Sequence, residues 1–486
     1  MHPELNNDLD PDSSADLRRF SLVVKREAPD LVGVSATSCH HAVAEKLAGY
    51  LKRHGFRMPI ILGGAHATFC PEDFATSHFD AFCVGEGERP LLELCRRIEQ
   101  GCPREHLFRD LPSFVAREVH GSRLPQPIPL AEPIEDLDTL APPDRDLFDM
   151  ATIIRSRQGW VDVCTARGCP HSCTYCCNNI YNRIHQSSFG APRRFRQRSV
   201  RSVIDEILSL KAKYGEQFRV VSFQEDFLNC NRRWMLDFCA AYAEEVALPF
   251  YMNGRADSVD AEMALALKRA GCREFSMGIE TGSDTLRNII YRKKVLTETI
   301  RHACLCLTGA GVDVFANIMV GAPGETWHSL SHTVRLLAEL TPRLVRVSIL
   351  VPMRGTDLYS YCHDHGLLSR EPDHVRSLFE ESCLRFEQFS PQELMRFRYL
   401  LGWKVNIAMR NVASRTYDEA CREFEQKPIE GWANGLLHEV VAVDAELSKQ
   451  AQRWAASHYR FFNGPQEMQD LGHVKRFELC RPGSAC

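Results

Sequence analysis

The chain has 486 residues, of which 44% are hydrophobic and 25% charged, a composition typical of a folded globular protein rather than a disordered one. Its 59 lysines and arginines nearly balance its 63 acidic residues. The resulting net charge of -4 argues against broad electrostatic binding to nucleic acid or to an anionic membrane. At roughly 150 residues per domain, the length predicts about three domains. The 20 cysteines are too few for a disulfide scaffold.

The N-terminal residues predict where the protein resides. Residues 1–16 are polar and acidic, without the basic start and apolar run of a signal peptide. The chain also lacks a run of about 18 apolar residues that could span a bilayer. We therefore expect a cytoplasmic protein with reduced thiols and no transmembrane segment. Residues 1–28 are interpreted as a disordered lead-in.

Short apolar segments alternate with helical patterns in residues 29–102. This alternation predicts an α/β domain with a parallel sheet. The following segment, 103–158, loses the alternation and is punctuated by prolines, so we interpret it as a linker with one hairpin at most. The apolar segments interpreted as strands are 30–35, 59–64 and 79–84.

Strand–helix alternation resumes in residues 159–368, where six apolar segments are each followed by a helical pattern. That order predicts a (β/α)6 arrangement, an open relative of the eight-fold barrel. Residues 369–486 are interpreted as a helical extension, in which Ser390 and Glu393 have the spacing of a capping box. The six strands are expected near 160–166, 218–223, 249–254, 274–278, 312–320 and 344–350.

A dense group of cysteines directly follows the first of these six strands. Cys169, Cys173 and Cys176 have the spacing C-x3-C-x2-C, close enough for three thiolates to converge on one metal centre. The loop follows the carboxyl end of a strand, where barrel active sites are built. A structural zinc site needs four ligands, usually in two pairs, and a disulfide is disfavoured in a reducing compartment. A [4Fe–4S] cluster with one open iron fits best.

On these residues the chain resembles the radical S-adenosylmethionine (SAM) superfamily, whose hallmark is this cysteine spacing with an aromatic residue before the third cysteine, here Tyr175. The resemblance implies that three thiolates hold the cluster and that the open iron chelates the amino and carboxylate groups of SAM. One electron then cleaves the sulfonium C–S bond, which in most of the family yields a 5′-deoxyadenosyl radical that abstracts a substrate hydrogen. Cys164 and Cys177 lie outside the spacing and are assigned no role.

Four later strand ends resemble motifs by which this family binds SAM. Glu225 is the preferred acidic residue for the amino group, with Asp226 next, and Pro352 to Thr356 matches the turn after the sixth strand. Each motif alone has a simpler interpretation, such as a solvated turn or an Arg255–Asp257 ion pair, but their order along the chain favours the family. The residues expected to contact SAM are Tyr175, Glu225, Asp226, Arg255, Glu280, Gly321, Pro323 and Gly324.

Residues 29–100 resemble the cobalamin (B12)-binding domain that precedes the barrel in one subgroup of the family. Glycines at strand ends would let a corrin or its nucleotide tail approach the backbone. The family domain opens with a further strand, helix and strand, so this Rossmann-like domain is predicted to be incomplete, and a structural cap over the barrel is the alternative. The residues expected to contact cobalamin are Ser35, Thr37, Gly63, Gly64, His66, Gly85 and Glu86.

The overall expectation is an α/β enzyme in which a partial (β/α)6 radical SAM barrel follows an incomplete B12-binding domain and precedes a helical extension. It implies cobalamin-dependent methyl transfer, or cyclisation or rearrangement, on a small-molecule biosynthetic intermediate. The alternatives are a cobalamin-independent dehydrogenase or rearrangement enzyme, and a non-catalytic iron–sulfur redox sensor. The expected partners are the substrate and a flavodoxin- or ferredoxin-type electron donor. No nucleic acid is expected, since residues 193–198 are interpreted as a solvated basic loop.

Overall fold

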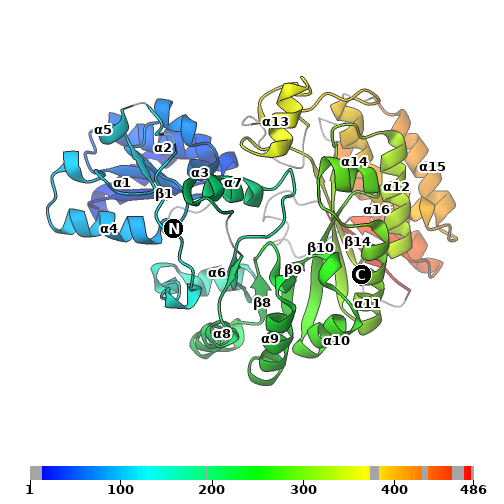
Figure 1. Cartoon of the computed structure of the whole chain (residues 1–486). Helices are drawn as coiled ribbons and strands as arrows, with labels where there is room; N and C mark the ends of the chain where they lie inside the picture. The colour runs from blue at the N-terminus through cyan, green and yellow to red at the C-terminus, as the bar shows by residue number, and fades with distance from the viewer. Residues whose placement is uncertain are drawn as a thin grey trace.

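The computed structural model describes residues 14–121, 123–125, 127–192, 195–372, 382–428, 436–461 and 476–482. Its N-terminal part is a four-stranded sheet of order β1-β2-β3-β4, flanked by helices (Figure 1). The first three strands are parallel and β4 is antiparallel to β3. The strands are β1 Val32–Ser35, β2 Ile60–Gly63, β3 Ala81–Cys83 and β4 Phe114–Ala116, and the helices are α1 Ser14–Glu27, α2 His41–Arg53, α3 Gly64–Phe69, α4 Glu88–Glu99 and α5 Arg117–His120.

Two of the predicted boundaries in this region are wrong. Residues 14–27 form the helix α1 rather than a disordered lead-in, because Phe20 and Val24 are buried in the core of the N-terminal domain. Residues 1–13 lie outside the described residues. Residues 114–116 belong to the domain and not to the linker, since Val115 is buried and pairs with Phe82 as part of β4. Among the described residues no strand precedes β1.

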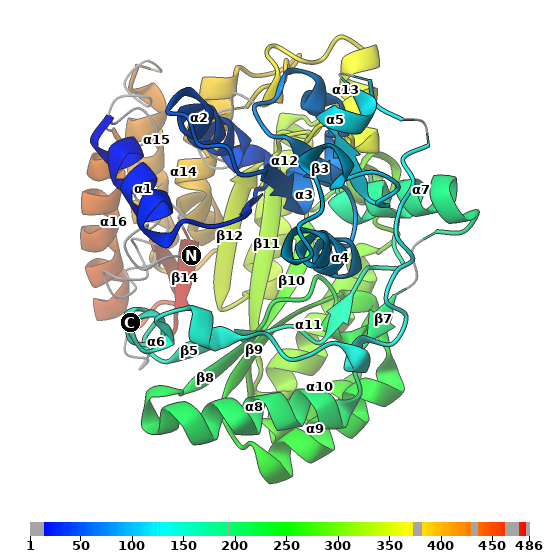
Figure 2. The same cartoon turned by 90° about the vertical axis from the view of Figure 1, so that its left-hand side faces the viewer.

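The predicted (β/α)6 arrangement is confirmed. Six parallel strands form one sheet in the order β5, β8, β9, β10, β11, β12, with helices outside it (Figures 1 and 2). The strands are β5 Trp160–Val163, β8 Val220–Phe223, β9 Phe250–Gly254, β10 Cys272–Glu280, β11 Asp313–Val320 and β12 Leu344–Ile349. The helices are α6 Met150–Ser156, α7 Cys177–Phe189, α8 Val200–Tyr214, α9 Arg232–Glu245, α10 Ala261–Ala270, α11 Thr297–Ala310, α12 Trp327–Leu340 and α13 Asp357–Asp364.

The C-terminal extension is only partly helical. Its helices are α14 Pro391–Ala408, α15 Ser414–Gln426 and α16 Leu436–Arg453, and α14 begins with the predicted capping box of Ser390 and Glu393. Two strands then extend the barrel sheet, β13 His458–Phe461 and β14 Arg476–Cys480, of which β14 is antiparallel to β12. Burial of Tyr459 and Phe477 in the barrel core holds them there. No described helix is long and apolar enough to cross a membrane.

The N-terminal domain docks against segments that follow the carboxyl ends of barrel strands. Figure 1 shows α3 beside α7, and the rings of Phe69 and Tyr181 meet edge to face with centroids 5.0 Å apart. Arg354, in the turn after β12, donates to both carboxylate oxygens of Asp73 at 2.8 and 3.1 Å. The two domains therefore meet at the end of the barrel where catalytic loops lie.

Gly282, in the turn after β10, is a position where the fold tolerates no side chain. A methyl group there would overlap the backbone of His332 and Thr333 in α12. We expect Gly282→Ala to lower the free energy of unfolding by about 1–3 kcal/mol, the usual cost of overpacking, as measured by urea denaturation. Gly309→Ala in α11 is the matched control, because its methyl group meets nothing within 4 Å and should stabilise the helix by about 0.5–1 kcal/mol. Equal urea midpoints for the two variants would contradict this packing.

Candidate functional site

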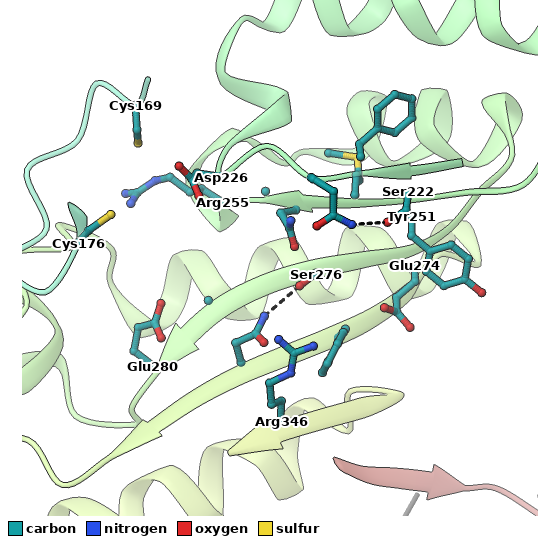
Figure 3. Close-up of a pocket in the computed structure, with 18 of the residues that line it drawn as sticks. Cys169, Cys176, Ser222, Asp226, Tyr251, Arg255, Glu274, Ser276, Glu280 and Arg346 are labelled. Atoms are coloured by element: carbon teal, nitrogen blue, oxygen red, sulfur yellow. Dashed lines mark hydrogen bonds between the residues drawn. The ribbon is translucent and has the colours of Figure 1, made fainter. Parts of the chain in front are cut away.

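The predicted cysteine loop leaves the sheet after β5 and opens into the barrel. Cys169 and Cys173 are buried, and Cys176 is half-buried at the residue that precedes α7. All three line a cavity of about 570 Å³ inside the barrel, with Cys169 and Cys176 at one end of it (Figure 3). Thr174 fixes the middle of the loop, because its backbone N–H donates to Tyr291 O at 3.0 Å and its hydroxyl to Ile290 O at 2.6 Å. The structure therefore brings the three thiols to one wall of one cavity.

The chemistry of these thiols fits a metal cluster. Burial raises the pKa of Cys169 to about 12 and also raises that of Cys173, whereas the neighbouring Cys177 thiol lowers the pKa of Cys176. Buried thiols become thiolates when a metal binds them, because the cation compensates the buried charge. Three cysteine donors beside an open cavity match a [4Fe–4S] cluster with one iron free for another ligand.

Glu280 is held at the end of β10 by a buried ion pair that the sequence did not reveal. Its carboxylate accepts from Lys293 Nζ at 2.5 Å and from the hydroxyl of Tyr175 at 3.0 Å, and all three residues line the cavity. Its backbone φ is 66°, a conformation that a residue other than glycine adopts at an energetic cost, and such strain is concentrated at functional sites. Gly278 leaves room for this arrangement, since a methyl group there would collide with the Glu280 carboxylate.

The two adjacent acidic residues after β8 point in different directions. Asp226 lines the cavity and accepts from Asn178 Nδ2 at 2.6 Å. Glu225 does not line it, because its carboxylate turns to the backbone N–H of Thr165 beneath the cysteine loop. The predicted order of preference, Glu225 before Asp226, is therefore reversed by the geometry. Only one of the two adjacent carboxylates therefore faces the cavity.

Glu225 gives the fold a pH dependence that can be measured. Burial raises the pKa of this carboxyl from 4.5 to about 7, so between these values the folded protein binds a proton that the unfolded chain releases. Its contribution to stability is therefore lost as the pH rises through this window. We expect Glu225→Gln to lose less stability than the wild type between about pH 5 and pH 8 in urea titrations. Glu244→Gln, at an exposed position of α9, should show the same change of unfolding free energy with pH as the wild type. An equal change with pH in Glu225→Gln would contradict the assignment of this pH dependence to Glu225.

Arg255 serves two purposes at once. Its guanidinium forms a two-point ion pair with Asp257, at 3.0 and 2.7 Å, as the simpler interpretation of the motif predicted. It also lines the cavity and donates to the backbone O of Lys293 at 2.9 Å. The ion pair fixes the guanidinium facing the cysteine end of the cavity (Figure 3).

The glycine–proline segment after β11 is not brought to this cavity. Gly321, Pro323 and Gly324 are absent from its lining. The backbone N–H groups of Gly321 and Ala322 instead donate to the buried carboxylate of Glu325. Gly321, with φ at 89°, also lies where a side chain would collide with Leu394 of α14. The segment thus packs against the C-terminal extension.

Several cavity residues could not be identified from motifs. Lys293 lies in a run of three basic residues whose inward-facing member the sequence does not mark, and Asn178 follows the cysteines without a motif of its own. The part of the cavity farther from the cysteines carries polar side chains among aromatic and apolar ones, unlike the packed apolar interior of most barrels. Its polar lining comes from successive strands and comprises Ser222, Asn253, Ser276, Asn317 and Arg346.

In the N-terminal domain the predicted glycines lie at the carboxyl ends of its parallel strands. Ser35 ends β1 and Gly63 ends β2, and the space beside Gly64 is so narrow that an added methyl group would lie 2.7 Å from Ser35 Oγ. Gly85 follows β3, and its N–H donates to Thr68 Oγ1 at 3.1 Å. Thr37 lies just beyond β1, with its Oγ1 2.8 Å from His40 Nδ1. The strand ends thus gather small and hydroxyl-bearing residues at the edge of the sheet where α/β domains bind ligands.

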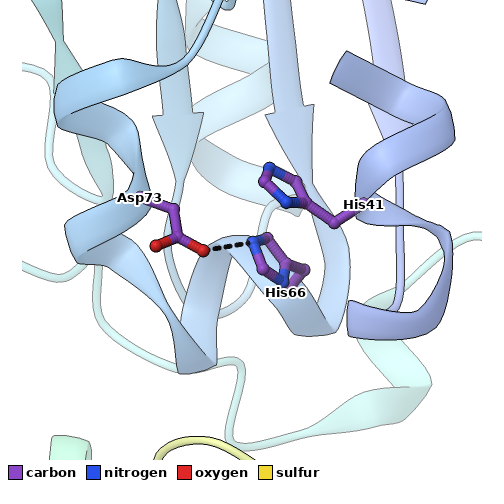
Figure 4. A group of neighbouring side chains, drawn as sticks. All are labelled: His41, His66 and Asp73. Carbon is purple, nitrogen blue, oxygen red and sulfur yellow. Dashed lines mark ion pairs between the residues drawn. The ribbon is translucent and has the colours of Figure 1, made fainter. Parts of the chain in front are cut away.

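His66 is buried next to His41 and Asp73 (Figure 4). Its Nε2 lies 3.1 Å from Asp73 and its Nδ1 3.2 Å from Ser38 Oγ, and its ring stacks on His41 with centroids 3.6 Å apart. Nδ1 thus hydrogen-bonds to Ser38, whereas Nε2 lies beside Asp73 without forming a hydrogen bond. A metal ion held by His41, His66 and Asp73 is also disfavoured, because Arg354 already compensates the charge of Asp73.

The side chain of Glu86 points across the domain boundary, towards the barrel domain. Its carboxylate pairs with Arg196, and with Arg167 at 3.4 Å, both of which belong to the barrel domain. The predicted contact of its carboxylate with cobalamin therefore does not fit the geometry. The loop sequence Gly85-Glu86 presents its glycine to one side and its charge to the other.

A (β/α)6 barrel with three converging cysteines, docked to a Rossmann-like domain, defines a radical SAM enzyme with a B12-binding domain. The family model described as the radical SAM superfamily matches residues 163–337, and that of the B12 binding domain matches residues 7–95. The chain therefore contains a radical SAM domain and a B12-binding domain, and these two domains support a [4Fe–4S] cluster, SAM and cobalamin as its cofactors. The second match starts well before residue 29 and includes α1, in agreement with the corrected boundary.

Curated relatives include both methyltransferases and a cyclase. An uncharacterized methyltransferase of Pyrococcus horikoshii is 26% identical over 71% of this chain and 72% of its own length. The anaerobic magnesium-protoporphyrin IX monomethyl ester cyclase of Rubrivivax gelatinosus is 25% identical, covering 94% and 85%. The cytidylyl-2-hydroxyethylphosphonate methyltransferase of Streptomyces wedmorensis is 23% identical, covering 74% and 72%. The chain is thus similar to enzymes of two reaction types.

Solved structures share the fold. The cobalamin-dependent radical enzyme OxsB matches with a TM-score of 0.61 at 13% identity, covering 90% of this chain and 69% of its own. The radical SAM methyltransferase TsrM from Kitasatospora setae matches with a TM-score of 0.60 at 17% identity, covering 82% and 81%. At these identities the likeness is one of fold.

Proposed function

We propose that Cys169, Cys173 and Cys176 hold the [4Fe–4S] cluster and that the chain uses it to cleave SAM for a cobalamin-dependent methyl transfer to a small molecule. The observation behind this proposal is that the three thiols share one cavity with Asp226, Arg255 and Glu280. When bound, the cluster supplies the electron that breaks the sulfonium C–S bond, and the corrinoid supplies a methyl group.

The protein's own residues position and shield this chemistry. Asp226 and Glu280 offer carboxylates to an ammonium group, and Arg255 offers a guanidinium to a carboxylate. Each is held in place by a neighbour: Asn178 for Asp226, Lys293 for Glu280 and Asp257 for Arg255. Burial holds the pKa of Tyr175 well above its usual range, so its hydroxyl stays protonated and donates to Glu280.

The N-terminal domain is the proposed cobalamin site. The ends of its strands offer Ser35, Thr37, Gly63, Gly64 and Gly85. The domain docks at the barrel end where the cysteine loop lies. That placement puts a corrinoid on the same side of the barrel as the cluster. An electron donor of the flavodoxin or ferredoxin type and a cytoplasmic location are proposed with it, since the cluster must be reduced and protected from oxygen.

Cyclisation is the second candidate reaction. The similarity to the Rubrivivax gelatinosus cyclase covers nearly the whole chain, whereas the similarity to the methyltransferases covers about three quarters. Methyl transfer to the cobalt consumes the SAM methyl group and leaves S-adenosylhomocysteine, whereas a ring closure that uses SAM only as a radical source leaves 5′-deoxyadenosine and methionine without S-adenosylhomocysteine.

The test is to produce the protein with hydroxocobalamin, load it with iron and sulfide without oxygen, and add SAM with dithionite. We expect an associated corrinoid band, about one S-adenosylhomocysteine per corrinoid as the cobalt is methylated, and slow formation of 5′-deoxyadenosine. Asp226→Asn should slow SAM cleavage at least about tenfold, whereas Glu225→Gln should not. Corrinoid binding without S-adenosylhomocysteine would favour cyclisation, and SAM left intact under all reducing conditions would contradict the proposal.

A further inference from the structure

A short two-stranded antiparallel ribbon, called the β6–β7 hairpin below, flanks the cysteine loop. It consists of β6 Ala166–Arg167 and β7 Arg196–Gln197, and Arg167 lies directly opposite Arg196 in the antiparallel register. Like charges opposite each other destabilise a strand pair, and a two-stranded ribbon this short has little other stabilisation. The hairpin therefore needs negative charge from outside itself.

Two glutamates of the N-terminal domain provide that charge. Glu86 pairs with Arg196 and lies 3.4 Å from Arg167, and Glu88 pairs with Arg167. The Arg196 side chain is 4% exposed and that of Glu86 is 13% exposed, so this pair is weakly screened by solvent. Arg196 also donates to Ile134 O at 2.6 Å, which ties the connecting segment to the same point.

The location of this ion-pair network links the two proposed cofactor sites. Arg167 is two residues before Cys169, and Glu86 adjoins Gly85 at the carboxyl end of β3. A displacement of the loop after β3 would therefore move the guanidinium at the start of the cysteine loop. Arg354 and Asp73 form another inter-domain link, between the turn after β12 and the segment after α3.

We propose that Glu86 and Glu88 are positioning residues that hold the β6–β7 hairpin and thereby order the cysteine loop when the N-terminal domain is docked. The proposal rests on the proposed function for the role of the cysteines, but the ion pairs themselves do not depend on a bound cluster. The N-terminal domain then has a second role besides binding cobalamin, because Glu86 and Glu88 contact the two strands that flank the cysteine loop. Neutralising both glutamates leaves two opposed, partly buried guanidinium groups.

The experiment is hydrogen–deuterium exchange of the full chain, with and without the reconstituted cluster, comparing the wild type with Glu86→Gln/Glu88→Gln. We expect backbone exchange in peptides covering 164–169 and 196–199 to accelerate at least about tenfold in the double variant. Arg354→Met is the matched control, because it breaks the other inter-domain link and should leave these peptides at the wild-type rate. Adding Arg167→Gln and Arg196→Gln to the double variant should restore slow exchange, since the repulsion is then gone.

The EPR signal of the reduced cluster and the exchange rates of the control variant test the proposal further. In the cluster-loaded protein, the double variant should broaden the EPR signal of the reduced cluster, whereas Arg354→Met should not. Unchanged exchange in the double variant, or the same acceleration in Arg354→Met, would overturn the proposal. If the wild type bound no iron, the proposed function would fail, but the exchange of the cluster-free chain would still decide whether the two glutamates hold the hairpin. If the double variant does not fold, Glu88→Gln alone tests the more exposed pair.

Discussion

Cys173→Ala is expected to abolish the cluster. The wild type should bind about four irons per chain after anaerobic reconstitution, and the variant should bind fewer than about one, because two remaining thiolates do not hold a [4Fe–4S] cluster. Cys173 is buried and lines the cavity together with the other two cysteines. Iron and sulfide analysis with the visible absorption spectrum measures the result.

The matched controls are the two cysteines of the same segment that lie outside the spacing. Cys164→Ala and Cys177→Ala should retain the iron, since neither thiol lines the cavity. Loss of iron from Cys177→Ala with retention in Cys173→Ala would show that the ligands are assigned wrongly. Equal loss in all three variants would point to general instability of the loop, which circular dichroism of the cluster-free proteins would reveal.

Lys293→Met is expected to have the second largest effect. It leaves the Glu280 carboxylate buried with only the Tyr175 hydroxyl as an identified hydrogen-bond donor, and removing one partner of a buried ion pair costs about 3–5 kcal/mol of stability. The urea midpoint should fall accordingly. SAM binding, measured by equilibrium dialysis with the cluster-loaded protein, should weaken as well, because Glu280 then lacks the partner that holds its carboxylate in the cavity.

The double variant Lys293→Met/Glu280→Gln separates these effects. It removes both charges, so its stability should recover most of the loss while its SAM affinity stays low. Lys294→Met is the control at the adjacent position, which does not line the cavity. A loss of stability in Lys294→Met as large as in Lys293→Met would contradict the buried pair, and full SAM affinity in the double variant would remove Glu280 from the binding site.

The sequence could predict features that depend on local spacing. Cys169, Cys173 and Cys176 are close along the chain, so their convergence follows from a single loop after a strand. The six parallel strands were likewise visible as apolar segments between helical patterns. The capping box of Ser390 and Glu393 is a contact between neighbours three residues apart.

The sequence could not predict features that depend on the direction of a side chain or on pairing between distant residues. Glu225 and Asp226 are adjacent and chemically alike, and only the backbone conformation after β8 decides which one faces the cavity. The same holds for Lys293 and Lys294. Glu86 was expected to contact cobalamin because the sequence around it resembles the B12-binding subgroup, whereas its partners Arg167 and Arg196 lie more than 80 residues away.

Three elements, α1, β13 and β14, were missed because their stabilisation comes from elsewhere in the fold. Many residues of α1 are charged, and the few apolar side chains that hold it, such as Phe20 and Val24, gain their burial only against the rest of the domain. Strand β14 forms by pairing with β12, more than 100 residues earlier in the chain, and β13 pairs in turn with β14. Tertiary burial and long-range pairing override weak local signals in both cases.

The most direct test of the whole account is the EPR spectrum of the dithionite-reduced, cluster-loaded protein, recorded before and after addition of SAM. A cluster held by three cysteines keeps one iron open, and SAM bound at that iron changes its electronic environment. The account predicts that the wild-type signal shifts on SAM addition and that Asp226→Asn needs a higher SAM concentration for the same shift. An iron–sulfur signal that saturating SAM leaves unchanged would contradict it.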